Sequence, residues 1–214
     1  MKKRNILLIL LMSLSMLSCS KWLDIQPESE IDRSVLLSTE DGFKEALIGI
    51  YTRCAKADLY GKELTIGTPE VLAQNYAMTS NDVLRYQQTK LFKYTDGNFI
   101  ERKDNIWKGL YNGIVNANLI LAEIDNKKQV FTGSNYSLVK GEALALRAYL
   151  HVDALRLFAP APVVNDKIEA IPYVTTYSNK STKLSTVSQV LDSAIRDLEQ
   201  AKTLLQVDPI PLKS

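Results

Sequence analysis

The chain has 214 residues, 46% of them hydrophobic and 23% charged, which is ordinary for a globular protein with one good core. Its 26 basic and 24 acidic residues form no clustered basic stripe, so no nucleic-acid partner is expected. One histidine and two cysteines also limit metal and disulfide chemistry.

The first residues are typical of a secretory signal. Three basic residues at positions 2–4 precede an apolar run, 6–17, that is too short to span a bilayer comfortably. The run ends Met16-Leu17-Ser18-Cys19, which resembles a bacterial lipobox, although Met16 stands where leucine is usual. We therefore predict a lipoprotein signal peptide over residues 1–18 and a lipid anchor on Cys19. The alternative is an ordinary cleaved signal followed by an incidental cysteine.

A tether and a first helix should follow. Residues 19–38 contain Pro27 and mixed charge and are predicted to be an extended tether; residues 39–214 should form a helical domain. Thr39 is a plausible N-cap of a helix that ends near Lys56. Cys54 lies on the apolar face of this helix, and with Cys19 lipidated it has no disulfide partner. We predict a buried, inert thiol there and not a reactive one.

The segment from Ala57 to Phe99 shows no sustained hydrophobic period; a short helix around Glu70 to Met78 is the most that its pattern allows. A long irregular stretch in a compact domain usually marks a functional insertion. Local chemistry alone selects five candidate ligand-binding residues within it: Asp82, Arg85, Tyr86, Tyr94 and Asn98. The alternative is that the aromatic residues merely pack the insertion onto the helices.

Two long helices come next. The first, from about Arg102 to Asp125, has an apolar stripe interrupted by Asn118, for which a buried, hydrogen-bonded amide is favoured over a ligand contact. After a polar loop, the second runs from about Tyr136 to Pro160 and is apolar nearly all round, so it should be buried. Its charged residues are predicted to form internal salt bridges with other helices: Glu142, Arg147, Asp153 and Arg156.

A last helix follows an irregular crossing segment over residues 161–184. It begins with Thr186-Val187-Ser188-Gln189, a capping-box pattern, and its apolar face continues to Leu205. Four helices joined as helix–loop–helix predict an all-α protein of tetratricopeptide-like hairpins, with a long irregular insertion between the first two long helices. Their spacing is too uneven for a regular repeat to be read from the sequence.

No catalytic or cofactor site is recognisable. The sole histidine, His151, lies in the middle of the most buried helix, where a core role is favoured over a metal or triad role. No glycine-rich phosphate loop is present. Asp82, Glu101 and Asp104 are available as acids, but nothing in the sequence marks two of them as the carboxylate pair of a glycosidase. We therefore predict a protein that is not an enzyme and uses no metal or cofactor.

Four stretches, in this order, resemble the SusD/RagB family of outer-membrane nutrient-binding lipoproteins of Bacteroidota. They are Cys19 to Pro27, Trp107 to Leu121, Gly141 to Pro162, and Ala170 to Pro172 together with the helix from Thr186 to Leu205. The run Gly141-Glu142-Ala143-Leu144-Ala145-Leu146-Arg147-Ala148 is the most recognisable part. The sequence departs from the family at Ala159-Pro160, where members usually carry a glycine before the proline.

The resemblance implies a tetratricopeptide-like scaffold that docks onto a SusC-like, TonB-dependent outer-membrane transporter. The protein would be anchored in the outer membrane, exposed at the cell surface, and would capture glycan or peptide without breaking a bond. Family ligand residues vary with substrate, so none transfers by position. Members commonly continue well past the fourth helix, so we expect a truncated gene product, a fragment of a longer protein or a degenerate paralogue, in each case with an incomplete ligand site. The rival hypotheses are a scaffold lipoprotein that binds no nutrient, and a secreted hydrolase.

Overall fold

A computed structural model describes residues 33–78 and 85–206, all within one compact unit that begins at Arg33. The predicted leader, Cys19 and most of the predicted tether lie outside the described residues. The main elements of the described part are α2 (Arg33–Leu36), α3 (Glu40–Cys54), α4 (Thr68–Leu72), α5 (Gln87–Lys90), α6 (Gly97–Glu123), the 3-10 helix η2 (Ile124–Val130), α7 (Asn135–Phe158), β1 (Glu169–Ile171), β2 (Ser185–Thr186) and α8 (Val187–Leu205).

The predicted first helix is confirmed as α3. The Thr39 hydroxyl accepts a hydrogen bond from the Gly42 backbone N–H at 3.1 Å and so caps the helix. The end of the segment predicted as tether instead forms α2, and the Leu37 side chain after it is 2% exposed, in the core. The turn from α2 into α3 is tight: a Cβ at Gly42 would lie 1.6 Å from the Leu36 carbonyl oxygen.

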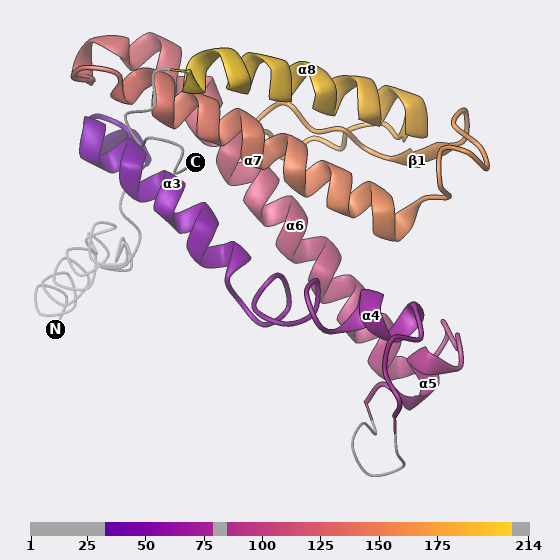
Figure 1. Ribbon diagram of the computed structural model, residues 1–214. Coiled ribbons are helices and arrows are strands. Elements are labelled where there is room, and N and C mark those ends of the chain that lie inside the picture. The colour runs from indigo at the N-terminus through magenta and orange to yellow at the C-terminus, as the bar shows by residue number, and fades with distance from the viewer. Residues whose placement is uncertain (1–32, 79–84, 207–214) are drawn as a thin grey trace, which may run out of the picture. The chain divides into compact units, whose positions relative to one another are not determined.

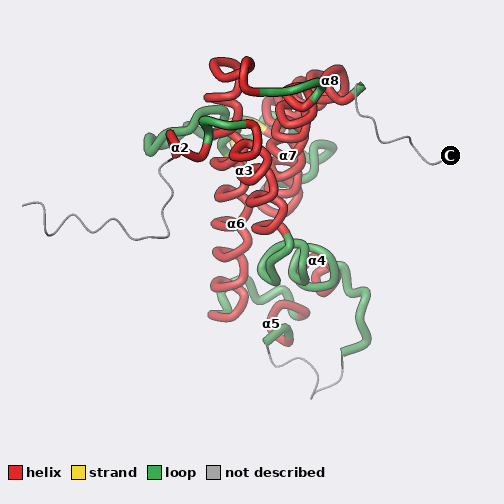
Figure 2. The backbone as a smooth tube through the Cα atoms, turned by 90° about the vertical axis from the view of Figure 1, so that its left-hand side faces the viewer, coloured by secondary structure: helices red, strands yellow, loops and turns green. Residues whose placement is uncertain are grey.

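The long helices α3, α6, α7 and α8 run side by side, and successive ones are antiparallel hairpins (Figures 1 and 2). Helix α7 contacts α3, α6 and α8 and is buried among them, as its sequence predicts. Helix α6 begins five residues earlier than predicted, at Gly97 and not at Arg102, because the Asp96 carboxylate accepts from the Phe99 N–H at 3.2 Å and caps it there. No helix of the described residues is long and apolar enough to cross a membrane.

Helix α8 begins where the capping-box pattern predicted. The Thr186 hydroxyl accepts from the Gln189 N–H at 3.2 Å, and the Gln189 side chain accepts from the Thr186 N–H at 2.9 Å. Before it, β1 and β2 pair as a short antiparallel ribbon that the helical prediction did not include.

The chain after β1 lies against the helices through side-chain bonds to its backbone. The Asn118 amide donates to the Val174 carbonyl at 2.8 Å, and the Val174 N–H donates to His151 Nε2 at 2.9 Å. His151 Nδ1 therefore carries the proton and donates to the Arg147 carbonyl at 2.8 Å. The His151 ring also stacks on Tyr173, with centroids 3.9 Å apart. Both Asn118 and His151 are buried structural residues, as predicted.

The charged residues of α7 follow the prediction in one case. Arg147 donates to both Asp197 oxygens, at 2.7 and 2.6 Å, and so forms the expected salt bridge between α7 and α8. Asp153 is instead paired within α7, with Arg156 at 2.7 Å, and Glu142 accepts from a tyrosine hydroxyl. The prediction of salt bridges to other helices is wrong for these three. The hydroxyls of Tyr51 and Tyr60, and not cations, face Glu142 and Asp153, and the Arg156 side chain is 68% exposed.

Candidate ligand-binding site

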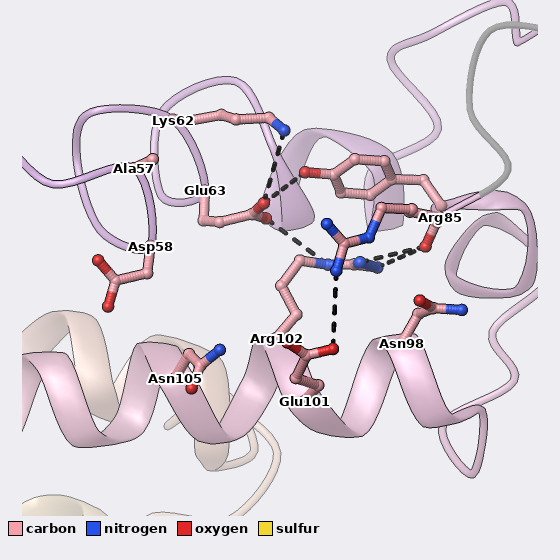
Figure 3. A pocket seen from close by; sticks show the side chains of 10 residues that line it. Ala57, Asp58, Lys62, Glu63, Arg85, Asn98, Glu101, Arg102 and Asn105 are labelled. Carbon is pink, nitrogen blue, oxygen red and sulfur yellow. Dashed lines mark hydrogen bonds and ion pairs between the residues drawn. The ribbon is translucent and has the colours of Figure 1, made fainter.

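A cavity of about 240 Å³ lies where the insertion meets the first turns of α6 (Figure 3). We call it the polar cleft. Its lining residues are Ala57, Asp58, Lys62, Glu63, Arg85, Tyr86, Asn98, Glu101, Arg102 and Asn105.

The coil that follows α3 forms one wall of the polar cleft. It folds back on itself through backbone bonds from the Tyr60 N–H to the Cys54 carbonyl and from the Glu63 N–H to the Ala57 carbonyl, both 3.0 Å. A Cβ at Gly61 would lie 2.3 Å from the Ala55 carbonyl oxygen, so only glycine fits this reversal. The reversal places three polar side chains of this coil, Asp58, Lys62 and Glu63, in the lining of the cleft.

Glu63 is the buried acid of the cleft, at 7% exposure. It accepts hydrogen bonds from the Tyr86 hydroxyl and from the Thr68 hydroxyl, the latter at 2.9 Å, and its Oε2 lies 3.6 Å from Arg102 Nε. Burial and the neighbouring Glu63 carboxylate raise the pKa of the Tyr86 phenol, so this hydroxyl remains a donor. A buried carboxylate is tolerated here because hydroxyls and a guanidinium compensate its charge.

Arg102 ties the insertion to α6. Its guanidinium donates to the Arg85 carbonyl at 3.1 and 2.9 Å and to the Thr89 hydroxyl at 2.9 Å, and it lies 4.1 Å above the Tyr86 ring centroid. Its Nε has no hydrogen-bond partner among the described residues, because Glu63 at 3.6 Å is an ionic contact only. Ionic contact, hydrogen bonds and stacking thus hold Arg102 at the base of the cleft, and its Nε–H makes no hydrogen bond to the described residues.

The rim of the cleft is open to solvent. Arg85 and Glu101 lie 3.6 Å apart with side chains 71% and 60% exposed, and the Lys62 side chain is 52% exposed (Figure 3). Asn98 and Asn105 present exposed amides from α6. These groups offer hydrogen-bond donors and acceptors to a polar ligand. The described residues hold no group of three or more His, Cys, Asp or Glu that could bind a metal ion.

An apolar pocket of about 250 Å³ adjoins the polar cleft and shares Lys62 and Tyr86 with it. Its other lining residues are Ile66, Val71, Tyr76, Ala77 and Met78. A ligand that carries both hydroxyl groups and apolar faces would find surfaces of both kinds side by side.

The structure brings together three of the five residues selected from the sequence: Arg85, Tyr86 and Asn98 all line the cleft. Tyr86 is 8% exposed, so its ring is a packed wall, as the alternative of packing aromatics expected. Tyr94 lies outside the cleft lining; it is 56% exposed and its ring centroid is 5.3 Å from that of Phe99. Asp82 lies outside the described residues. That these side chains contact a ligand stays a prediction.

Two central residues of the cleft were missed. Glu63 lies in an aperiodic coil, and the pattern around Arg102 predicts only the start of a helix. The available signal was weak: a glycine on each side of Glu63, at positions 61 and 67, indicated close backbone approach.

Comparison with known proteins gives consistent matches. The model of a SusD-like family, described as "Starch-binding associating with outer membrane", matches residues 21–212. SusD-like protein P38 of Formosa agariphila is 28% identical over 211 residues, covering 96% of this chain and 38% of that protein. SusD-like protein P25 of the same organism is 24% identical over 201 residues, covering 91% of this chain and 38% of that protein.

Solved structures show the same arrangement of helices. A SusD superfamily protein from Bacteroides thetaiotaomicron has a TM-score of 0.64 at 21% identity, covering 78% of this chain and 37% of that one. A SusD-like carbohydrate binding protein from Bacteroides vulgatus has a TM-score of 0.63 at 23% identity, and the match covers 78% of this chain and 36% of that protein. The predicted helical fold class is confirmed, and this chain spans 38% of the length of both curated relatives.

Proposed function

The chain belongs to the SusD-like family, and from that premise we propose that it captures a glycan at the cell surface without breaking a bond. The observation that carries the proposal is the polar cleft beside its apolar pocket. A sugar presents hydroxyl groups around its edge and C–H groups on its faces, which match the two surfaces. The family description and the name of the Bacteroides vulgatus structure, a carbohydrate binding protein, agree with this ligand class.

The rim residues are the proposed ligand contacts. Arg85 and Asn98 donate from opposite elements, the insertion and α6, while Glu101 accepts. Glu63 and Arg102, beneath them, position the walls. Because the chain spans 38% of its relatives' length, the cleft is proposed as one part of a larger binding surface in the longer proteins.

We also propose membrane anchoring through Cys19 and transfer of the glycan to a SusC-like, TonB-dependent transporter. The lipobox pattern supports the anchor, and the family description supports association with the outer membrane. A Cys19→Ser variant should incorporate no labelled palmitate and should leave the membrane fraction. Labelling of that variant would contradict the anchor. The wild-type chain should co-purify with a TonB-dependent barrel from detergent-solubilised outer membranes, and failure to recover one would contradict the proposed partner.

Affinity electrophoresis tests the cleft. Native gels would contain soluble starch, xylan, polygalacturonate, laminarin or mannan, and at least one should retard the wild-type chain. Arg85→Ala and Asn98→Ala remove exposed side chains and should weaken retardation by about fivefold, the loss of one or two hydrogen bonds. Their matched controls are Arg196→Ala on α8 and Asn112→Ala on α6, which lie outside the cleft lining and should behave like wild type.

The outcomes separate the hypotheses. If the wild type is retarded and the cleft variants match it, the cleft is not the glycan site, although glycan capture survives. If no polysaccharide retards the wild type but a TonB-dependent barrel co-purifies with it, the scaffold lipoprotein is favoured instead.

A further inference from the structure

A second cavity, of about 420 Å³, lies between α3 and α7 and is not used by the proposed cleft. Its lining residues are Tyr51, Cys54, Ala55, Tyr60, Gly61, Leu146 and Tyr149. We call it the tyrosine groove. Its volume is within the range of small-molecule sites, roughly 300–1,000 Å³.

Three tyrosine rings form the groove, and two are well exposed: Tyr51 at 46% and Tyr149 at 52%. The rings of Tyr60 and Tyr149 lie with centroids 5.4 Å apart at an interplanar angle of 35°. The floor is apolar, with Leu146 and Cys54 each 9% exposed. The groove therefore presents exposed aromatic rings to solvent above a buried apolar floor.

Two of the three phenol groups, those of Tyr51 and Tyr60, are held by carboxylates of α7. The Tyr51 hydroxyl donates to Glu142 at 2.7 Å, and the Tyr60 hydroxyl donates to Asp153 at 2.7 Å. Arg156 donates to the other oxygen of Asp153 at 2.7 Å. Because the hydroxyls of Tyr51 and Tyr60 are already bonded, a ligand meets ring faces held in place, which lowers the entropy lost on binding.

We infer that the tyrosine groove stacks a second saccharide unit of the captured glycan; this inference rests on the proposed function. The C–H groups on a pyranose face carry partial positive charge and are attracted to the negative face of an aromatic ring. The Glu142 carboxylate, which is only partly buried, lies beside the groove through its bond to Tyr51 and has further lone pairs that can accept from sugar hydroxyls. Fixed rings with neighbouring carboxylates fit a sugar better than a wholly apolar partner.

One short coil links the groove to the polar cleft. Ala55, Tyr60 and Gly61 line the groove, while Asp58, Lys62 and Glu63 line the cleft. A polysaccharide that contacts both sites gains affinity through the high effective concentration of the second contact. The groove should therefore matter more for polymers than for short oligosaccharides.

The test compares variants of the full chain in gels that contain the polysaccharide most retarding to the wild type. Tyr149→Ala removes a half-exposed ring and should weaken binding about threefold to tenfold, the value of one stacking contact. Tyr149→Phe keeps the ring face and should bind within about twofold of wild type. Ile195→Ala, at a 52% exposed side chain of α8, is the control for loss of an exposed apolar group and should have no effect. Thermal unfolding checks that all variants fold.

Each outcome decides the inference. Unchanged binding by Tyr149→Ala together with weakened binding by Arg85→Ala overturns the groove and leaves the proposed function intact. Equal losses in Tyr149→Phe and Tyr149→Ala would also overturn it, because the ring face would then not be the contact. If Tyr149→Ala loses a co-purifying outer-membrane protein but keeps glycan binding, the groove serves a protein partner. If no polysaccharide retards the wild type, both the proposed function and the groove fail.

Discussion

Two buried arginines, Arg147 inside the helical layer and Arg102 where α6 meets the insertion, have different sets of partners. Arg147 joins α7 to α8 and α6 through bonds to Asp197 and, at 2.9 Å, to the Asn118 side chain. Arg102 joins α6 to the insertion through bonds to a backbone carbonyl and a hydroxyl, and its Nε has no hydrogen-bond partner among the described residues. Arg147 lies inside a packed helical layer, whereas Arg102 lies at the base of an open cleft.

The difference indicates that the helical layer around Arg147 is rigid, whereas the cleft around Arg102 keeps polar groups accessible to solvent. In the helical layer, the buried carboxylate of Asp197 also accepts from the Tyr173 hydroxyl at 2.6 Å, so charge and hydroxyls satisfy one another. Around Arg102, the exposed Arg85, Glu101 and Lys62 are only loosely paired and free to reorient toward a ligand.

Substitution of Arg147 should lower the free energy of unfolding more than any other change proposed for this chain. Arg147→Ala leaves the Asp197 carboxylate buried without its cation and should lower the free energy of unfolding by about 3–5 kcal/mol. Arg102→Ala should cost less, about 1–3 kcal/mol, because Glu63 keeps two hydroxyl donors and lies beside open solvent. Urea unfolding of both variants measures this. An equal or larger loss for Arg102→Ala would contradict the contrast.

The second prediction concerns pH and His151. Burial is the main reason that the pKa of His151 lies at about 4, below its ordinary value near 6.5. The unfolded chain therefore takes up a proton first as pH falls, so stability is complete above about pH 6.5 and decreases down to about pH 4. The loss from this group should be about 3 kcal/mol. Groups facing His151 are Arg147, Asp197, Tyr111 and Tyr173.

The matched variant for that measurement is His151→Gln. It should be less stable at pH 7, because its amide replaces a fitted ring, but its stability should change less between pH 6.5 and 4. Urea unfolding at several pH values compares the slopes. Parallel slopes for the two proteins would show that His151 does not set the acid sensitivity of the helical layer.

The third prediction concerns the packing of the coil after α3 against α6, where the insertion meets the helical layer. A Cβ at Gly109 would lie 2.4 Å from Arg53 Nη2 and 2.9 Å from Leu59 Cδ2, so Gly109→Ala should cost about 1–3 kcal/mol by forcing the coil away from α6. Gly49 has no atom within 4 Å of its Cβ position, so Gly49→Ala should stabilise α3 by up to about 1 kcal/mol. Thermal unfolding of the pair checks both signs; destabilisation by both substitutions would argue against the close approach.

The smallest expected effect is at Tyr94. Its exposed ring contacts Phe92 and Phe99 and lies outside the cleft lining, so Tyr94→Ala should change glycan retention by about twofold at most, less than Asn98→Ala. Affinity electrophoresis of the two variants in the same gel measures the ratio. A complete loss of retention in Tyr94→Ala would move the binding surface from the cleft to this aromatic cluster.

The helical layer was largely predictable because its signals are local. The helix caps at Thr39 and Thr186 depend on residues close in sequence. So do the apolar faces of α3 and α8 and the all-round apolar character of α7. The buried roles of Asn118 and His151 followed from their place on those faces. The family resemblance, carried by the same helices, was confirmed over residues 21–212.

The cleft was predictable only in part, since its geometry depends on long-range closure. Arg85, Tyr86 and Asn98 were selected for their chemistry, but their approach to Glu63 requires the coil reversal at Gly61 and the early start of α6. No periodic pattern marks either feature. The partners of Glu142 and Asp153 were missed for the same reason: Tyr51 and Tyr60 reach them from residues 91 and 93 positions away.

Hydrogen–deuterium exchange would show whether a glycan binds in the polar cleft. The wild-type chain would be measured alone and with the polysaccharide of the panel that retards it most. Amides over residues 55–63 and 85–105, which form the cleft walls, should exchange more slowly with glycan, while those of α8 (187–205) should not change. Unchanged exchange in the cleft walls, or protection confined to α8, would contradict glycan capture in the polar cleft.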